Sequence, residues 1–130
     1  MKKVLAPILV ALLVIAALIL SVRAMRAGEP EVKAAPVAVR GTVVDMHCYV
    51  THGIHDSGHT ACSNACIARG VPAGLLAEDG TLYVLFEEKP FSVKDRVAGL
   101  ADVPVIVRGT PVVRSGIKGL QVASIEKRGE

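Results

Sequence analysis

The sequence contains no tryptophan and only two tyrosines and two phenylalanines. It also lacks a charge surplus outside its N-terminus, because residues 31–130 hold 11 basic and 11 acidic side chains, and the net charge of +3 reflects four basic residues before position 27. Proteins that bind single-stranded nucleic acid stack bases on exposed aromatic rings along a basic groove. Tyr83 and Phe86 lie in an apolar run that predicts core packing. These features disfavour nucleic-acid binding.

Motifs of common enzymes are absent as well. The chain has no glycine-rich phosphate loop and no serine nucleophile elbow, and Asp45 and Asp56 are isolated carboxylates of the kind that usually form turns or face solvent. The Cys-x2-Cys-His motif of covalent haem attachment does not occur. The sequence therefore favours a non-enzymatic role.

The N-terminus carries the one long hydrophobic run. Residues 4–22 are uncharged and mostly aliphatic, follow two lysines, and precede Arg23 and Arg26. Their number, 19, approaches what a helix needs to cross a bilayer. A cleaved secretory signal has the same basic start but a shorter apolar part. The two arginines favour an uncleaved, single-pass membrane anchor over residues 1–27, with the domain in the periplasm or otherwise outside the cytoplasm.

Residues 28–36 have the small, charged and proline-bearing composition of a linker, which leaves 37–130 as the folded domain. The β-branched run 37–50 predicts a long strand with a bulge or bend at Gly41, which would carry Cys48 at its end. An alanine-rich helix is expected over 60–69, with Gly70 as its C-terminal cap.

The remaining residues predict short strands and one further helix. The expected elements are a hairpin within 74–88 around Asp79-Gly80, a helix with Ser92 as N-cap, and an antiparallel pair formed by 103–108 and 119–126. The fold class is therefore mainly β.

Five strands with a helix between the third and fourth, a glycine-bent first strand and a "VIVRG" fourth strand resemble the OB-fold superfamily, in a membrane-tethered bacterial form. The resemblance covers roughly residues 37–127 and implies a small five-stranded OB-like barrel with a Cys/His insertion at 47–72. A tethered OB domain outside the cytoplasm also resembles the haem chaperones of cytochrome c maturation. Those proteins attach haem through a histidine in a flexible C-terminal part, whereas here no histidine follows His59.

All three cysteines and all four histidines lie between His47 and Cys66. On a helix, the spacing His59-x2-Cys62-x3-Cys66 puts the three side chains on one face. With Cys48 arriving from the preceding strand, they make a Cys3His set, a common tetrahedral arrangement for zinc. The predicted metal ligands are Cys48, His59, Cys62 and Cys66, with His47, His52 and His55 as further candidates.

Alternatives stay open at this point. In an oxidising compartment Cys48 could pair with Cys62 or Cys66, which would give a disulfide-stapled or thiol-redox interaction module with one spare thiol. Catalysis would use the thiolate of Cys62 or Cys66 with His59 as base, and Cys62 is the better placed because it lies near the start of the helix. Haem with an axial histidine or cysteine, or copper with Met46 as a soft ligand, are the other cofactors considered. Beyond the membrane, a protein partner is expected.

Overall fold

The computed structural model describes residues 12–21, 34–89 and 93–129, and the chain divides into two units, Met1–Val32 and Lys33–Glu130. In the first unit, residues 12–21 are helical. The predicted anchor therefore lies partly outside the described residues, as does most of the predicted linker. Within the described parts of the chain, no helix has both the length and the apolar character required to span a membrane.

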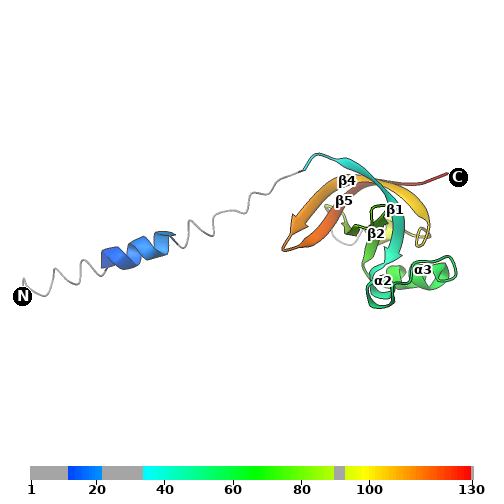
Figure 1. Cartoon of the computed structure of the whole chain (residues 1–130), viewed down its shortest axis with the longest axis horizontal. Helices are drawn as coiled ribbons and strands as arrows, with labels where there is room; N and C mark the ends of the chain where they lie inside the picture. The colour runs from blue at the N-terminus through cyan, green and yellow to red at the C-terminus, as the bar shows by residue number, and fades with distance from the viewer. Residues whose placement is uncertain (1–11, 22–33, 90–92, 130) are drawn as a thin grey trace, which may run out of the picture. The chain divides into compact units, whose positions relative to one another are not determined.

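The second unit is mainly β, as predicted. Its five strands form a sheet that closes in a ring in the order β1-β2-β3-β5-β4, because β4 pairs back onto β1 (Figure 1). All neighbouring strands are antiparallel except β3 and β5. The strands are β1 (Val37–Asp45), β2 (Ala73–Ala77), β3 (Leu82–Phe86), β4 (Pro104–Arg114) and β5 (Ile117–Lys127).

Three short helices connect these strands. α2 (Met46–His52) and α3 (Thr60–Ala68) both lie between β1 and β2 in the chain, and they sit together beside the end of β1 (Figure 1). α4 (Val93–Arg96) lies between β3 and β4 where a helix was predicted, although Ser92, its expected N-cap, lies outside the described residues. α2 and α3 occupy the segment that holds every cysteine and histidine.

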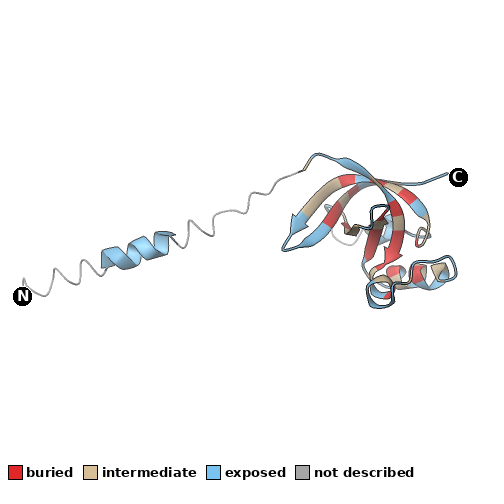
Figure 2. Cartoon of the chain, in the orientation of Figure 1, coloured by how far each residue is buried: buried red, intermediate tan, exposed pale blue. Residues whose placement is uncertain are grey.

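The core fills the ring with aliphatic side chains from alternate strand positions. Val43, Leu75, Val105 and Leu120 are fully buried, and Ile67 of α3 joins the same cluster. Buried residues run along the strands and one side of α3 (Figure 2). No cysteine belongs to this cluster of the described residues.

Glycines allow two close approaches between strands. A Cβ atom at Gly41 would lie 2.3 Å from the carbonyl oxygen of Leu76, and one at Gly109 would lie 2.2 Å from that of Gln121. The register of β1 runs unbroken through Gly41 in both of its pairings, so the predicted bulge there was wrong. The register shift lies instead at Arg108/Gly109, between β4 and β5.

The two hairpins confirm the turn predictions in part. β2 and β3 pair around Asp79-Gly80, where Asp79 Oδ1 accepts the Thr81 N–H at 2.8 Å. β4 and β5 are longer than the 103–108 and 119–126 predicted, because they continue to a turn at Ser115-Gly116. Pro111 has no backbone N–H to donate to a neighbouring strand. It is tolerated within β4 because the pairing of β4 with β1 stops at Gly109, so no carbonyl of β1 lies opposite it.

Candidate functional site

The strand predicted to run to residue 50 ends at Asp45, and the residues that follow form α2. That part of the prediction was wrong. Asp45 has extended backbone angles and caps the helix, since its Oδ1 accepts the N–H of His47 at 2.7 Å and that of Cys48 at 3.2 Å. Gly53 ends the helix in the left-handed conformation, with φ of 71°. Cys48 therefore comes from a helix, one turn after its aspartate cap.

α3 forms where it was predicted. Its N-cap is His59, whose carbonyl accepts the Ser63 N–H at 3.0 Å, and Gly70 follows its end with φ of 106°. Ser63 and Ile67, one turn apart, are buried against the ring. The stripe beside them carries Cys62 and Cys66, also one turn apart, so the packing of α3 fixes where these two thiols lie.

The three thiols converge. Cys48 and Cys66 each interact with the thiol of Cys62, and both also interact with the carboxylate of Asp45. Cys48 is buried, Cys66 is half-buried and Cys62 is exposed, and all three are free thiols. Cys48 therefore lies near Cys62 of α3, although it belongs to a helix and not to the end of a strand as predicted.

Asp45 is the electrostatic centre of this thiol cluster (Asp45, Cys48, Cys62 and Cys66). Only 1% of its surface is exposed, and its second oxygen, Oδ2, is buried without a hydrogen bond of normal geometry. Its interaction as a hydrogen-bond acceptor, followed by burial and by its negative charge, raises the pKa of Cys66 to about 11. Burial and then the charge of Asp45 raise the pKa of Cys48. Both thiols therefore keep their protons at neutral pH.

Sequence analysis missed Asp45 as part of the site, because an isolated carboxylate more often faces solvent. One signal was available. Aspartate is a favoured N-cap, and Asp45-x-x-Cys48 has the spacing at which a cap and a side chain of the first turn adjoin.

The histidines are distributed differently from the thiols. His59, a predicted ligand, is half-buried at the start of α3 and makes no capping hydrogen bond with its side chain. His47, His52 and His55 are exposed. The rings of His47 and His52 meet edge to face at 6.4 Å between centroids, while His55 packs against Tyr49 and its Nδ1 lies 2.8 Å from the Gly53 carbonyl.

No set of three or more His, Cys, Asp or Glu side chains, among the residues that the structure describes, has an arrangement that could hold a metal ion as it stands. The arrangement of the thiols and the carboxylate suits protonated cysteines. A protonated thiol donates a weak hydrogen bond to an oxygen or sulfur acceptor. Binding a cation at this place would require the four side chains to rotate toward a common point.

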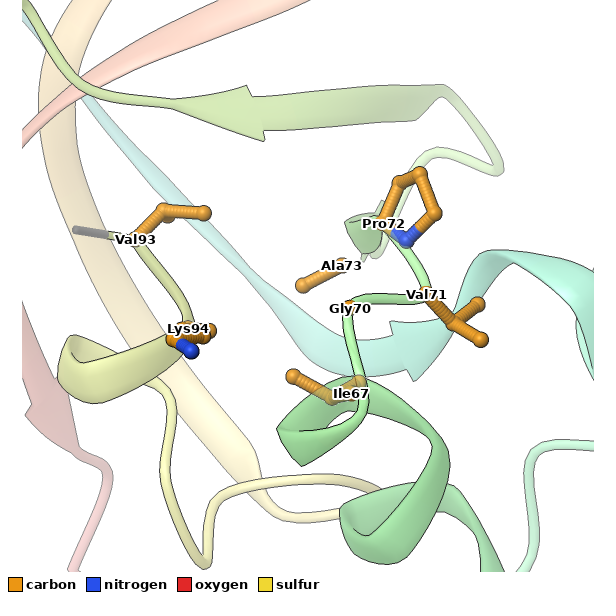
Figure 3. A pocket seen from close by; sticks show the side chains of 7 residues that line it. All are labelled: Ile67, Gly70, Val71, Pro72, Ala73, Val93 and Lys94. Carbon is orange, nitrogen blue, oxygen red and sulfur yellow. The ribbon is translucent and has the colours of Figure 1, made fainter. Parts of the chain in front are cut away.

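A pocket of about 230 Å³ lies between the C-terminal end of α3 and α4 (Figure 3). Val93 and Lys94 line one side, and the opposite side is formed by Ile67 and the segment 70–73. Lys94 is the one charged residue in its lining. The pocket contains none of the thiols.

Comparison with known proteins gives no relative: no protein family matches the sequence, and neither the curated proteins nor the solved structures include a significant match.

Proposed function

We propose that the domain binds a divalent metal ion, with zinc favoured, through the thiolates of Cys48, Cys62 and Cys66. The observation that carries the proposal is that two thiols from two helices, Cys48 and Cys66, both interact with the buried carboxylate of Asp45 and with the thiol of Cys62. Zinc is bound by sulfur, nitrogen and carboxylate oxygen, and three thiolates with one further ligand complete a tetrahedral site.

The charge of the cluster supports a cation as its ligand. Asp45 has a buried oxygen without a hydrogen-bond partner, an arrangement that costs free energy unless something compensates it. Its negative charge and burial hold protons on Cys48 and Cys66. A bound divalent cation reverses this local preference, because it stabilises thiolates and a carboxylate together, and binding then releases the thiol protons.

Two residues are candidates for the fourth ligand of the proposed zinc ion. Asp45 offers the free Oδ2 oxygen, while its Oδ1 keeps α2 capped. His59 precedes Cys62 by three residues and has a side chain that makes no cap hydrogen bond. We favour Asp45, because it already interacts with two of the thiols.

Thiol catalysis by Cys48 or Cys66 has less support. Reactive cysteines have lowered pKa values, whereas here the pKa of Cys66 is raised to about 11 and that of Cys48 is raised too. A disulfide through Cys62, which interacts with both other cysteines, remains the competing chemistry, and the experiment below distinguishes it.

We also propose that the second unit is a five-stranded OB-like barrel with the thiol cluster in the β1–β2 connection. The strand order, the parallel pairing of β3 with β5 and the position of α4 between β3 and β4 support this proposal. We further propose that the apolar run 4–22 tethers the domain to the membrane outside the cytoplasm. Protease digestion of intact spheroplasts should then degrade the domain, whereas protection from the protease would contradict this location.

The metal proposal is tested by purifying the full chain without chelators. We expect about one equivalent of zinc by elemental analysis and three titratable thiols after denaturation under nitrogen. Metal-free protein with a single titratable thiol would refute the proposal in favour of a disulfide. A strong visible absorption band typical of haem or copper would replace zinc with that cofactor.

Single substitutions then assign the ligands. Cys48→Ser and Cys66→Ser should each abolish stoichiometric zinc, whereas His55→Ala, an exposed histidine outside the thiol cluster, should retain it. Comparison of zinc affinity between Asp45→Asn and His59→Ala then assigns the fourth ligand, which is the residue whose substitution causes the larger loss. Retention of zinc by both cysteine variants would refute the site.

A further inference from the structure

The hairpin formed by β4 and β5 extends beyond the ring. Among the described residues, the part of β4 after Gly109 and the part of β5 before Gly119 pair only with each other. The strands are joined by a turn at Ser115-Gly116, where both residues have positive φ, 50° and 81°. Residues 113–118, which we call the hairpin tip, are all exposed (Figure 2).

The hairpin tip combines exposed aliphatic side chains with cations. Val113 is 69% exposed and Ile117 is 64% exposed, although both side chains are apolar. Lys118 pairs with Val113 and Arg114 pairs with Ile117 across the strands. Because paired residues lie on the same face of a hairpin, each face of the tip carries one aliphatic and one basic side chain. No acidic residue occurs between positions 103 and 125 of the sequence.

One acidic side chain from a neighbouring turn lies near the hairpin tip. The pKa of Asp79 is lowered chiefly because Thr81 donates hydrogen bonds to its carboxylate, and in smaller part because Lys118 is nearby. Lys118 therefore has a partial counter-charge. Arg114 takes part in none of the ion pairs among the described residues. The tip therefore keeps a positive charge.

The end of the ring that carries the hairpin tip is also the end at which the chain enters it. Val37 begins β1 and pairs with Gly109, and the end of β4 lies five residues further along, about 17 Å. The 14 residues 23–36 separate Val37 from the apolar run 4–22, and they can span at most about 50 Å. A membrane that holds the apolar run is therefore within reach of the tip.

We propose that the hairpin tip inserts into the surface of an anionic lipid bilayer. Val113 and Ile117 enter the interfacial region, where they gain free energy by leaving water. Arg114 and Lys118 contact lipid phosphates, because a negatively charged membrane attracts cations at its surface. An added strand from a second chain fits less well, since Pro111 lies on the free edge of β4 and disfavours such pairing. The inference rests on the proposed membrane tether and is independent of the zinc site.

The absence of tryptophan from the chain allows a single-tryptophan measurement. The full-length Ile117→Trp variant is reconstituted into vesicles of phosphatidylcholine and phosphatidylglycerol whose acyl chains carry bromine, which quenches nearby tryptophan fluorescence. Val50→Trp is the matched control, because Val50 is 65% exposed on α2, which follows the opposite end of β1. Bromine should quench at least about half of the emission of Ile117→Trp and less than about a tenth of that of Val50→Trp. Equal quenching of both variants, or none of Ile117→Trp, would overturn the proposal.

Charge reversal tests the part played by the cations. Arg114→Glu with Lys118→Glu, introduced into Ile117→Trp, should reduce the quenching at least about threefold, because both attractions to the anionic surface become repulsions. Arg69→Glu with Lys127→Glu makes the same change in net charge at exposed positions outside the hairpin tip, and it should leave the quenching nearly unchanged. An equal effect of the two double substitutions would contradict a contact made by the tip.

Vesicle flotation before and after alkaline carbonate separates this proposal from the membrane tether, because carbonate releases proteins that are held only at the surface. Release of a chain whose Ile117→Trp was quenched would contradict the tether and support the tip contact. Retention without quenching would contradict the tip contact and support the tether, and failure to float at all would contradict both. A blue shift of Ile117→Trp that increases with protein concentration in lipid-free detergent would assign the tip to a second copy of the chain and overturn the proposal.

Discussion

The clearest test of the electrostatics at the thiol cluster is the replacement of Asp45. Asp45→Asn removes the negative charge but keeps a side-chain oxygen that can cap α2, because asparagine and aspartate are about equally good N-caps. Asp45→Ala removes both the charge and the cap. The two variants therefore separate the effect of Asp45 on the thiols from its effect on the helix.

In metal-free, reduced protein, Asp45→Asn should lower the pKa of Cys66 from about 11 toward its usual value of 9.0, because the acceptor interaction with Asp45 is the largest cause of the increase. The thiolate fraction of Cys66 at mildly alkaline pH should then rise by roughly tenfold to a hundredfold. A short alkylation pulse followed by peptide mass spectrometry measures this fraction at each cysteine separately. An unchanged alkylation rate at Cys66 would refute the assignment of Asp45 as the cause.

The same shift makes a prediction about stability against pH. The unfolded thiol of Cys66 loses its proton near pH 9.0, while the folded one keeps it to about pH 11. Its contribution to stability is therefore complete below pH 9 and is lost as the pH rises from there to 11. Urea unfolding across this range should show a steeper loss for the wild type than for Asp45→Asn. Asp45→Ala should in addition lower the free energy of unfolding by about 0.5–2 kcal/mol at neutral pH, through the lost cap.

Three further substitutions test the packing by urea denaturation. Ile67→Ala, at a residue only 2% exposed, should lower the free energy of unfolding by about 2–5 kcal/mol, whereas Val50→Ala on the exposed face of α2 should change it by less than about 0.5 kcal/mol. Gly109→Ala should destabilise by roughly 1–3 kcal/mol because its Cβ would meet a backbone oxygen at 2.2 Å, and Gly129→Ala, with open space around it, is the matched control. Ser115→Asn should stabilise by about 0.5–1 kcal/mol, because Ser115 has φ of 50° and asparagine tolerates that region better.

The sequence predicted those elements whose signals are local. The Asp79-Gly80 turn and the α3 helix could be predicted, because a turn dipeptide and a helix-ending glycine determine the backbone conformation of only a few neighbouring residues. The extent of β4 and β5 was not, because Gly109 and Pro111 are typical of a turn, whereas β4 continues through both and pairs with β5 up to Arg114. The bulge predicted at Gly41 was wrong, because the contact that requires this glycine is distant in the chain. Gly41 lets the backbone of β2 come close, and from sequence such a glycine resembles one that permits a bulge.

The thiol cluster was predictable in its cysteines but not in its carboxylate. Cys62 and Cys66 share a helix face by spacing alone, and Cys48 could be expected to join them. Asp45 was not found, because its burial follows from its place at the end of a core strand: Val43 and Val44, directly before it, are fully buried. After Val44, the aspartate is the only sequence signal that distinguishes a strand followed by a capped helix from a strand that continues.

Asp45 also determines how the cluster and the ring depend on each other. It is the last residue of β1 and pairs with Ala73 of β2, so its position is fixed by the ring. The cysteines, in contrast, contribute nothing to the aliphatic core cluster within the described chain. Binding of a ligand at the thiols would therefore not require the core to be rebuilt, since one oxygen of Asp45 can keep α2 capped. Cysteine substitutions should leave the ring folded, and for that reason loss of metal in those variants can be attributed to the ligands themselves.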